Sequence, residues 1–174
     1  MGAWDRITAT IAAEFSDIND LEQLTRIVLR LLLAALLGGL IGLERELAGK
    51  PAGLRTHMLV ALGSALFVLI PLQAGIQIED LSRVIQGLLA GVGFLCAGSI
   101  LKAAGEDQVH GLTTAASLWM TAAIGMGAGM GREALVLLST LMALGVLALE
   151  GPIRRLLDRR QRQVLTADKP DRRG

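Results

Sequence analysis

Five stretches of this chain carry no Asp, Glu, Lys or Arg, and the charged residues gather between them. The stretches cover residues 31–43, 56–78, 84–101, 111–131 and 134–149. Apolar residues run continuously through each stretch instead of alternating with polar ones, which is typical of a membrane helix and not of a barrel strand. A helix needs roughly 20 apolar residues to cross the hydrocarbon core of a bilayer. The pattern therefore predicts membrane-spanning helices.

We predict an all-α, polytopic integral membrane protein with about five transmembrane helices. The spans are expected at residues 24–43, 57–77, 84–102, 112–131 and 133–150, so that residues 24–150 form one transmembrane domain. The fifth span is the shortest, and a tilted or partly interfacial helix is its alternative. Arg26 and Arg30 interrupt the first span, and we expect their side chains to reach towards a membrane face.

The two ends of the chain differ in charge, which predicts how it is oriented. Residues 1–23 read as an acidic amphipathic helix that either lies in the membrane interface or packs as an additional helix. Residues 151–174 read as a basic tail, and basic residues also gather in the connection at 42–57. The positive-inside rule places the N-terminus outside and the C-terminus in the cytoplasm. An odd number of spans requires the same arrangement.

Composition supports the membrane assignment and narrows the chemistry. The chain is 52% hydrophobic and 19% charged, whereas soluble domains are about one quarter charged. Its only cysteine, Cys96, excludes an internal disulfide and a Cys-based metal cluster. His57 and His110, without a ligand pattern, are weak evidence for a metal site. No phosphate loop or nucleophile–base motif occurs, so we expect no catalytic residue, no metal, no cofactor, no enzymatic activity and no nucleic-acid partner.

Small residues recur four positions apart in three of the spans. The stretches are "GGLIG" at 38–42, "GLLAG" at 87–91 and "GMGAGMG" at 125–131. This spacing lets helix backbones approach closely in lipid. We favour packing within one subunit, with Gly91 and Gly93 as close-approach positions, and a homodimer face is the alternative.

Two pairs of similar stretches predict an internal repeat. "LLGGLIGLE" at 36–44 resembles "LLAGVGFLC" at 88–96, and "GLRT" at 53–56 resembles "GLTT" at 111–114. The repeat would be a parallel pair of helical hairpins followed by a fifth helix. It would align two cytoplasmic helix entrances, where exposed amides attract anionic groups. The threonines at these entrances are alternatively simple helix caps.

The charged block "GLERELAGKPAGLRTH" at 42–57 separates the first two spans. Its basic residues help to fix the topology, but this does not explain its glutamates. Glu44 lies near the hydrocarbon edge, where an unpaired carboxylate is costly. We therefore predict a partly buried ion pair between Glu44 and Arg55, with Arg45 facing lipid headgroups or a partner and Glu46 nearer water.

These motifs together resemble the MgtC/SapB family, also called MgtC/SapB/YhiD. The resemblance rests on "GLERELAGKPAGLRTHMLVALGSALF", "DLSRVIQGLLAGVGFLCAGSILK" and "VHGLTTAASLWMTAAIGMGAGMG", and covers roughly residues 24–150. It implies a bacterial inner-membrane protein associated with adaptation to low magnesium and, in pathogens, with survival inside host cells. It also implies a regulator of a membrane complex such as the ATP synthase, more than a magnesium pump. Membrane lipids are the other expected partner.

The resemblance also implies a set of candidate functional residues. Cys96 stands where the family usually has Gly, and Thr113 occupies a position that is Asn in the MgtC branch. The candidates are Glu44, Arg45, Glu46, Gly53, Arg55, Thr56, His57, Asp80, Arg83, Gly91, Gly93, Gly98, Gly111, Thr113, Thr114 and Trp119.

Three classes of function remain open on the sequence. A regulatory membrane protein is the hypothesis that we favour. A transporter or channel for Mg²⁺, another small ion or a lipid is the alternative, although no Asp or Glu lies within the uncharged stretches and Mg²⁺ favours carboxylate oxygens. A membrane enzyme is the third class, disfavoured because no catalytic motif occurs.

Overall fold

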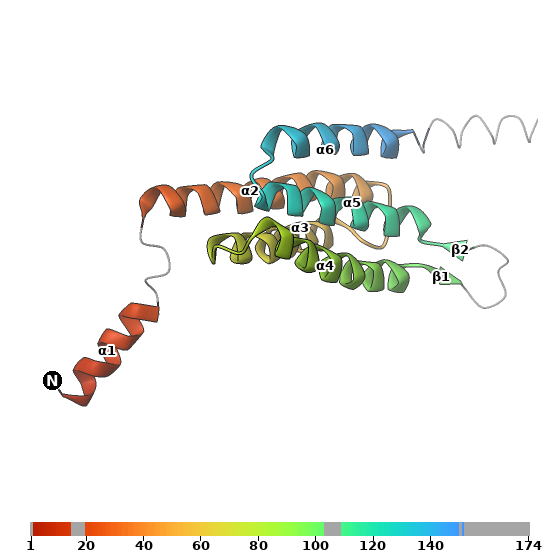
Figure 1. The fold of residues 1–174 in the computed structure, drawn as a ribbon. Helices are drawn as coiled ribbons and strands as arrows, with labels where there is room; N and C mark the ends of the chain where they lie inside the picture. Colours follow the sequence, from red (N-terminus) through yellow and green to blue (C-terminus); the bar gives the residue numbers. More distant parts are fainter. Residues whose placement is uncertain (1, 15–19, 103–108, 150, 152–174) are drawn as a thin grey trace, which may run out of the picture.

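The computed structural model describes residues 2–14, 20–102, 109–149 and 151. Figure 1 shows a bundle of long helices with one separate N-terminal helix. The elements are α1 (Ala3–Glu14), α2 (Leu21–Leu47), α3 (Leu54–Gln73), α4 (Ile78–Ser99), β1 (Leu101–Lys102), β2 (Val109–His110), α5 (Leu112–Gly129) and α6 (Glu133–Ala148). The basic tail lies outside the described residues, apart from Gly151.

Helices α2 to α6 cover the five predicted spans and alternate in direction along the bundle (Figure 1). The C-terminus of α2, the N-termini of α3 and α5, and the β1–β2 pair lie at one end, which we call the hairpin end. We call the other end, where α2 begins, the Asp20 end. Within the described residues, α2, α3 and the segment Glu79–Ser99 of α4 are long and apolar enough to cross a membrane. The count of five spans, the repeat and the orientation stay predictions.

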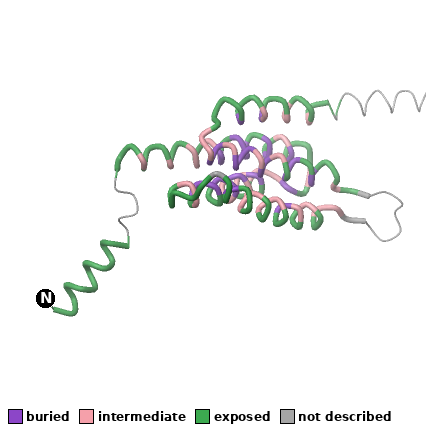
Figure 2. The backbone as a smooth tube through the Cα atoms, viewed as in Figure 1, coloured by how far each residue is buried: buried purple, intermediate pink, exposed green. Residues whose placement is uncertain are grey.

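Helix α5 is the most enclosed helix of the bundle. It packs against α2, α3, α4 and α6, and Figure 2 shows buried backbone concentrated in α5, α3 and the second half of α2. Its sequence includes Thr114, Ser117 and Thr121, all buried. The hydroxyl of Ser117 donates to the Thr114 carbonyl oxygen, and that of Thr121 donates to the Ser117 carbonyl oxygen. These two buried hydroxyls are thus satisfied by the backbone of α5 itself.

Glycines set the close contacts of α3 with α2 and α5. A Cβ atom at Gly38 of α2 would lie 2.7 Å from the Ala61 Cβ, and one at Gly129 of α5 would lie 2.6 Å from the Ala65 carbonyl oxygen. Both crossings therefore depend on glycine. The expectation for Gly91 and Gly93 is wrong, because an added Cβ at either position would meet open space. These two glycines belong to α4, which lies on the outside of the bundle and buries little of its surface.

The N-terminal helix α1 stands apart from the bundle (Figure 1) and buries no residue. Its apolar side chains Trp4, Ile7 and Ile11 are exposed. This arrangement fits the interfacial alternative better than packing as an additional bundle helix. The remainder of the predicted apolar stripe, Phe15 and Ile18, lies outside the described residues.

The end of the third predicted span differs from expectation. Helix α4 ends at Ser99, and Leu101 and Lys102 instead pair in antiparallel fashion with His110 and Val109. The chain must turn back here to enter α5, and the pairing satisfies backbone groups that leave the helix. The fold is thus all-α apart from this short pair of strands.

Candidate functional site

The side chain of Arg45 enters the bundle at the hairpin end of α2. Arg45 is completely buried, although it belongs to the last turn of the helix. Its guanidinium donates from Nη2 to Glu44 Oε1 at 2.7 Å and from Nε to Glu44 Oε2. Such paired bonds are the strongest contacts that Arg makes with a carboxylate, and a buried guanidinium is costly without them. The hydrogen bonds with Glu44 therefore stabilise the guanidinium of Arg45 inside the bundle.

This arrangement corrects the expected pair of Glu44 with Arg55. Arg55 is exposed in the first turn of α3, and the carboxylate of Glu44 goes to Arg45 instead. The reason is the position of Arg45 on its helix. Gly38, Ile41 and Arg45 lie three and four residues apart on the buried stripe of α2, so Arg45 cannot face lipid headgroups.

Glu46 caps the helix that follows. Its Oε2 accepts a hydrogen bond from the Leu54 backbone N–H at 2.9 Å, which satisfies one of the free amides at the start of α3. A Cβ atom at Gly53 would lie 2.6 Å from the same oxygen. Gly53 thus leaves the space that the carboxylate occupies, and both motif residues contribute to the α2–α3 connection.

His57 joins the first turn of α3 to α5. The ring is completely buried, with Nδ1 at 2.9 Å from the Gly53 carbonyl oxygen and Nε2 at 3.2 Å from Ser117 Oγ. A carbonyl only accepts, so Nδ1 carries a proton. Ser117 Oγ lies 2.8 Å from the Thr114 carbonyl oxygen, and its one proton can go to that oxygen or to Nε2, but not to both. When Nε2 carries no proton, the Ser117 hydroxyl can donate to it. When Nε2 is protonated, Nε2 donates to Ser117 Oγ, and the hydroxyl donates to the Thr114 carbonyl oxygen.

Helix α5 begins with a glycine in the left-handed region. Gly111 has φ +91° and lies against the Ser99 backbone, where a Cβ atom has no room. A side chain is therefore excluded at this N-cap on both steric and conformational grounds. Thr114 follows as a buried residue, whereas Leu112 and Thr113 are exposed.

Two clefts flank the turn at Lys50 and Pro51. One, of about 430 Å³, is lined by Lys50, Pro51, Ser99, His110, Gly111, Leu112, Thr113 and Thr114. The other, of about 460 Å³, is lined by Glu46, Lys50, Pro51, Gly53, Leu54, Arg55 and Thr56. Each cleft lies at the N-terminus of a helix, the second at that of α3 and the first at that of α5. We define the hairpin-end face as Lys50, Pro51, Arg55, Thr56, Leu112 and Thr113.

The other candidate residues do not join this face. Asp80 and Arg83 lie at the start of α4, towards the Asp20 end, and form an exposed pair at 4.0 Å. Gly98, like Gly91 and Gly93, has open space beside it. Trp119 lies farther along α5 and is half exposed.

Sequence reasoning missed two features of the site. It assigned Ser117 no functional role, and it gave the basic residues of the 42–57 connection, including Lys50, no role beyond topology. A signal for Ser117 was its spacing, because it lies one helical turn after Thr113 and Thr114 on the helix that the repeat aligns with α3. Within the described parts of the chain, no group of three His, Cys, Asp or Glu side chains is placed to hold a metal ion.

Comparison with known proteins identifies the family. The description of the MgtC family matches residues 31–156. Protein SrpB of Synechococcus elongatus is 52% identical over 126 residues, which are 66% of this chain and 69% of SrpB. YhiD of Escherichia coli (strain K12), named as a candidate magnesium transporter, is 43% identical over 69% of this chain and 58% of its own length. Protein MgtC of Salmonella typhimurium (strain LT2) is 41% identical over 67% of this chain and 49% of its own length.

No solved structure matches the chain. The match to SrpB covers about two thirds of that protein, whereas those to YhiD and MgtC cover roughly half of theirs. The family match at residues 31–156 covers α3, α4 and most of α2, the helices that are long and apolar enough to cross a membrane, which identifies a membrane protein. The chain belongs to the MgtC family.

Proposed function

We propose that this chain is a multi-pass protein of the bacterial inner membrane that acts in adaptation to low magnesium by regulating another membrane complex, with the ATP synthase as the first candidate. The observation that carries the proposal is the hairpin-end face. Pro51, Arg55, Thr56, Leu112 and Thr113 are exposed and Lys50 is partly exposed, and two clefts open beside them. A surface of this kind is suited to binding a partner.

The chemistry of the face favours an acidic partner surface. Lys50 and Arg55 carry positive charge, and α5 begins beside them without a side-chain cap. At the start of α3, Glu46 already accepts from the Leu54 N–H. Helix N-termini and basic side chains both attract carboxylates and other anionic groups. We place the face in the cytoplasm, where the positive-inside rule puts the 42–57 connection.

The interior of the bundle supports regulation over ion transport. The described core between α2, α3 and α5 consists of side chains such as Ala34, Ile41 and Ile124, and glycine contacts close the helix crossings. A hard divalent cation needs oxygen ligands along its path. The carboxylate of Glu44 faces the hairpin end, where Arg45 neutralises it.

A reconstitution experiment tests the proposal. Proteoliposomes containing ATP synthase, with and without this protein, would be energised by a proton gradient and their rate of ATP synthesis measured. We expect the wild-type protein to change the rate and Arg55→Glu to abolish the change, because charge reversal on the face repels an acidic partner. Arg132→Glu, an exposed arginine beyond the Asp20 end of α5, is the matched control and should act like wild type.

Transport remains the second candidate, favoured by the name of YhiD. The buried line of His57, Ser117 and Thr121 is the feature of this chain that would serve it. Proteoliposomes that contain this protein alone would then take up Mg²⁺ saturably. Such uptake, together with an unchanged rate of ATP synthesis, would replace regulation by transport.

A further inference from the structure

Arg30 lies in the first half of α2, the longest of the described helices. Its Nη1 donates to the Gly129 carbonyl oxygen at 3.2 Å, at the end of α5. The guanidinium lies so close to Gly131 that a Cβ atom there would collide with it. Contrary to expectation, the side chain turns in towards α5. This contact fits a cation at a helix C-terminus, but it uses only one of the five donors of the guanidinium.

The remaining donors of Arg30 lack obvious partners in the described part of the chain. Nε is buried without a hydrogen bond. Among the described residues, no carboxylate forms an ion pair with Arg30, whereas Arg26, Arg45 and Arg83 each pair with a glutamate or aspartate. Charged groups within membrane helices are normally paired or placed at a functional site. A buried donor without a partner usually indicates a missing ion, water or ligand.

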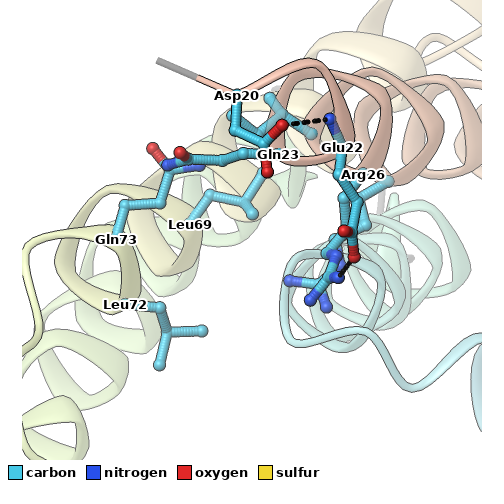
Figure 3. A pocket seen from close by; sticks show the side chains of 9 residues that line it. Asp20, Glu22, Gln23, Arg26, Leu69, Leu72 and Gln73 are labelled. Atoms are coloured by element: carbon cyan, nitrogen blue, oxygen red, sulfur yellow. Dashed lines mark hydrogen bonds and ion pairs between the residues drawn. The ribbon is translucent and has the colours of Figure 1, made fainter. Parts of the chain in front are cut away.

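Arg30 also lines a cleft between α2 and α3 at the Asp20 end. The cleft measures about 310 Å³ and is lined by Asp20, Glu22, Gln23, Arg26, Ile27, Arg30, Leu69, Leu72 and Gln73. Figure 3 shows the side chains of Gln23 on α2 and Gln73 on α3 approaching each other across it. Its size is at the lower end of small-molecule sites, which span about 300–1,000 Å³.

The charges of this cleft are unevenly compensated. Glu22 is paired with Arg26 at 2.5 Å, and Asp20 accepts from the Glu22 backbone N–H at 3.2 Å, at the positive end of the α2 dipole. Both acids are thus engaged near the start of α2. Asp20 precedes Arg30 by ten residues, or about 15 Å of helix. The inner part of the cleft therefore keeps the uncompensated charge of Arg30.

We infer that this cleft binds the phosphate group of a phosphate ester or of inorganic phosphate, with Arg30 as the principal donor. Arg26 lies one turn from Arg30 on the same helix face. Its Nη2 donates to Glu22, and the other N–H groups of its guanidinium supply further donors. Gln23 and Gln73 supply amide donors. Guanidinium groups hold phosphate oxygens through two parallel bonds. The same chemistry accommodates a phospholipid headgroup or a soluble phosphate, and neither depends on the proposed regulatory role.

The test is a titration of the full-length protein in detergent free of phosphate and of phospholipid. Inorganic phosphate, glycerol phosphate and phosphatidylglycerol would be the three probes, with a neutral glycolipid as the lipid control. Thermal unfolding would be followed by tryptophan fluorescence at each concentration. We expect a rise in the unfolding midpoint with at least one phosphate probe, and none with the glycolipid. A rise with the soluble probes assigns a free phosphate, and a rise with phosphatidylglycerol alone assigns a headgroup.

Two variants separate binding from a purely structural role of Arg30. Arg30→Gln should weaken apparent phosphate affinity by about tenfold or more, corresponding to about 1.4 kcal/mol, and Arg30→Lys should weaken it less. Gln73→Leu, in an exposed position at the end of α3, provides a second test if Arg30→Gln does not fold. Arg83→Gln, outside the cleft, should bind like wild type. Absence of any phosphate-dependent shift in the wild type, or equal affinity in wild type, Arg30→Gln and Gln73→Leu, would overturn the inference.

Discussion

Glu44 and Arg45 form an ion pair in which the arginine is completely buried, and replacing the carboxylate should lower the free energy of unfolding. Glu44→Gln preserves size but removes the carboxylate that pairs with the buried guanidinium of Arg45. Removing one partner of a fully buried pair costs about 3–5 kcal/mol. The Glu44 side chain keeps 27% of its exposure, whereas that of Arg45 keeps none. Water can therefore replace part of the lost interaction, and we expect a loss of about 2–3 kcal/mol.

A double-mutant cycle separates this pair from the one expected on the sequence. Arg45→Met removes the buried charge and keeps an unbranched side chain of similar length. In that background Glu44→Gln should cost only about 0–0.5 kcal/mol. Arg55→Gln changes an exposed residue, and its effect should stay within about 0.5 kcal/mol and add to that of Glu44→Gln.

Reversible unfolding in mixed detergent micelles would provide the free energies of unfolding for this cycle. The expected result is a coupling of about 2 kcal/mol between positions 44 and 45 and none between 44 and 55. The reasoning is refuted if Glu44→Gln is as mild as Arg55→Gln. It is also refuted if positions 44 and 55 couple strongly, since this would restore the original pairing.

Two further predictions concern packing and the histidine. Gly38→Leu should destabilise the bundle by more than about 2 kcal/mol, because the new side chain would collide with Ala61. Gly91→Leu has open space beside it and should change the unfolding midpoint little. Equal midpoints for the two variants would show that the crossing of α2 and α3 does not depend on glycine. Ser117→Ala should cost about 1–3 kcal/mol because Nε2 of His57 loses its partner in a buried position, as measured by the same unfolding assay; a neutral substitution would show that another group satisfies the ring.

The helices could be predicted well from the sequence because a membrane helix needs a long uninterrupted apolar stretch. The beginning and end of α5 and α6 agree with the predicted spans to within two residues. Helix α2 extends beyond its predicted span in both directions, because Glu22 and Arg26 pair on its exposed surface and Arg45 continues its buried stripe. Charged residues set the limits of the predicted span, but helix α2 continues beyond them.

The candidate site could be predicted only in part. The charged block located the connection between α2 and α3, and α3 and α5 begin directly after Gly53 and Gly111. Side-chain partners were harder to predict because they depend on which face of a helix turns inward. Arg45 and Arg55 carry the same charge in the same connection, yet one is buried and the other exposed. Which of the two arginines is buried depends on the face that α2 turns towards α3. The glycines of α2 that contact α3 determine this face.

The glycine-rich stretches illustrate the same limit. All three have the spacing for close approach, but only those of α2 and α5 meet a neighbouring backbone. The glycines of the stretch in α4 have no atom within contact distance of an added Cβ, although α4 contacts both α5 and α3. Spacing indicates that a helix can pack closely, and the order of the helices in the bundle decides whether it does.

Site-specific photocrosslinking in native membranes tests the central claim most directly. A photoreactive residue would replace Arg55 on the hairpin-end face or, as the control, Arg132 beyond the opposite end of the bundle. After irradiation, antibodies to the ATP synthase subunits would identify covalent products. Our account predicts a product from position 55 and none from position 132. The absence of a product at position 55, or equal yields from both positions, would contradict the role of this face in binding the complex.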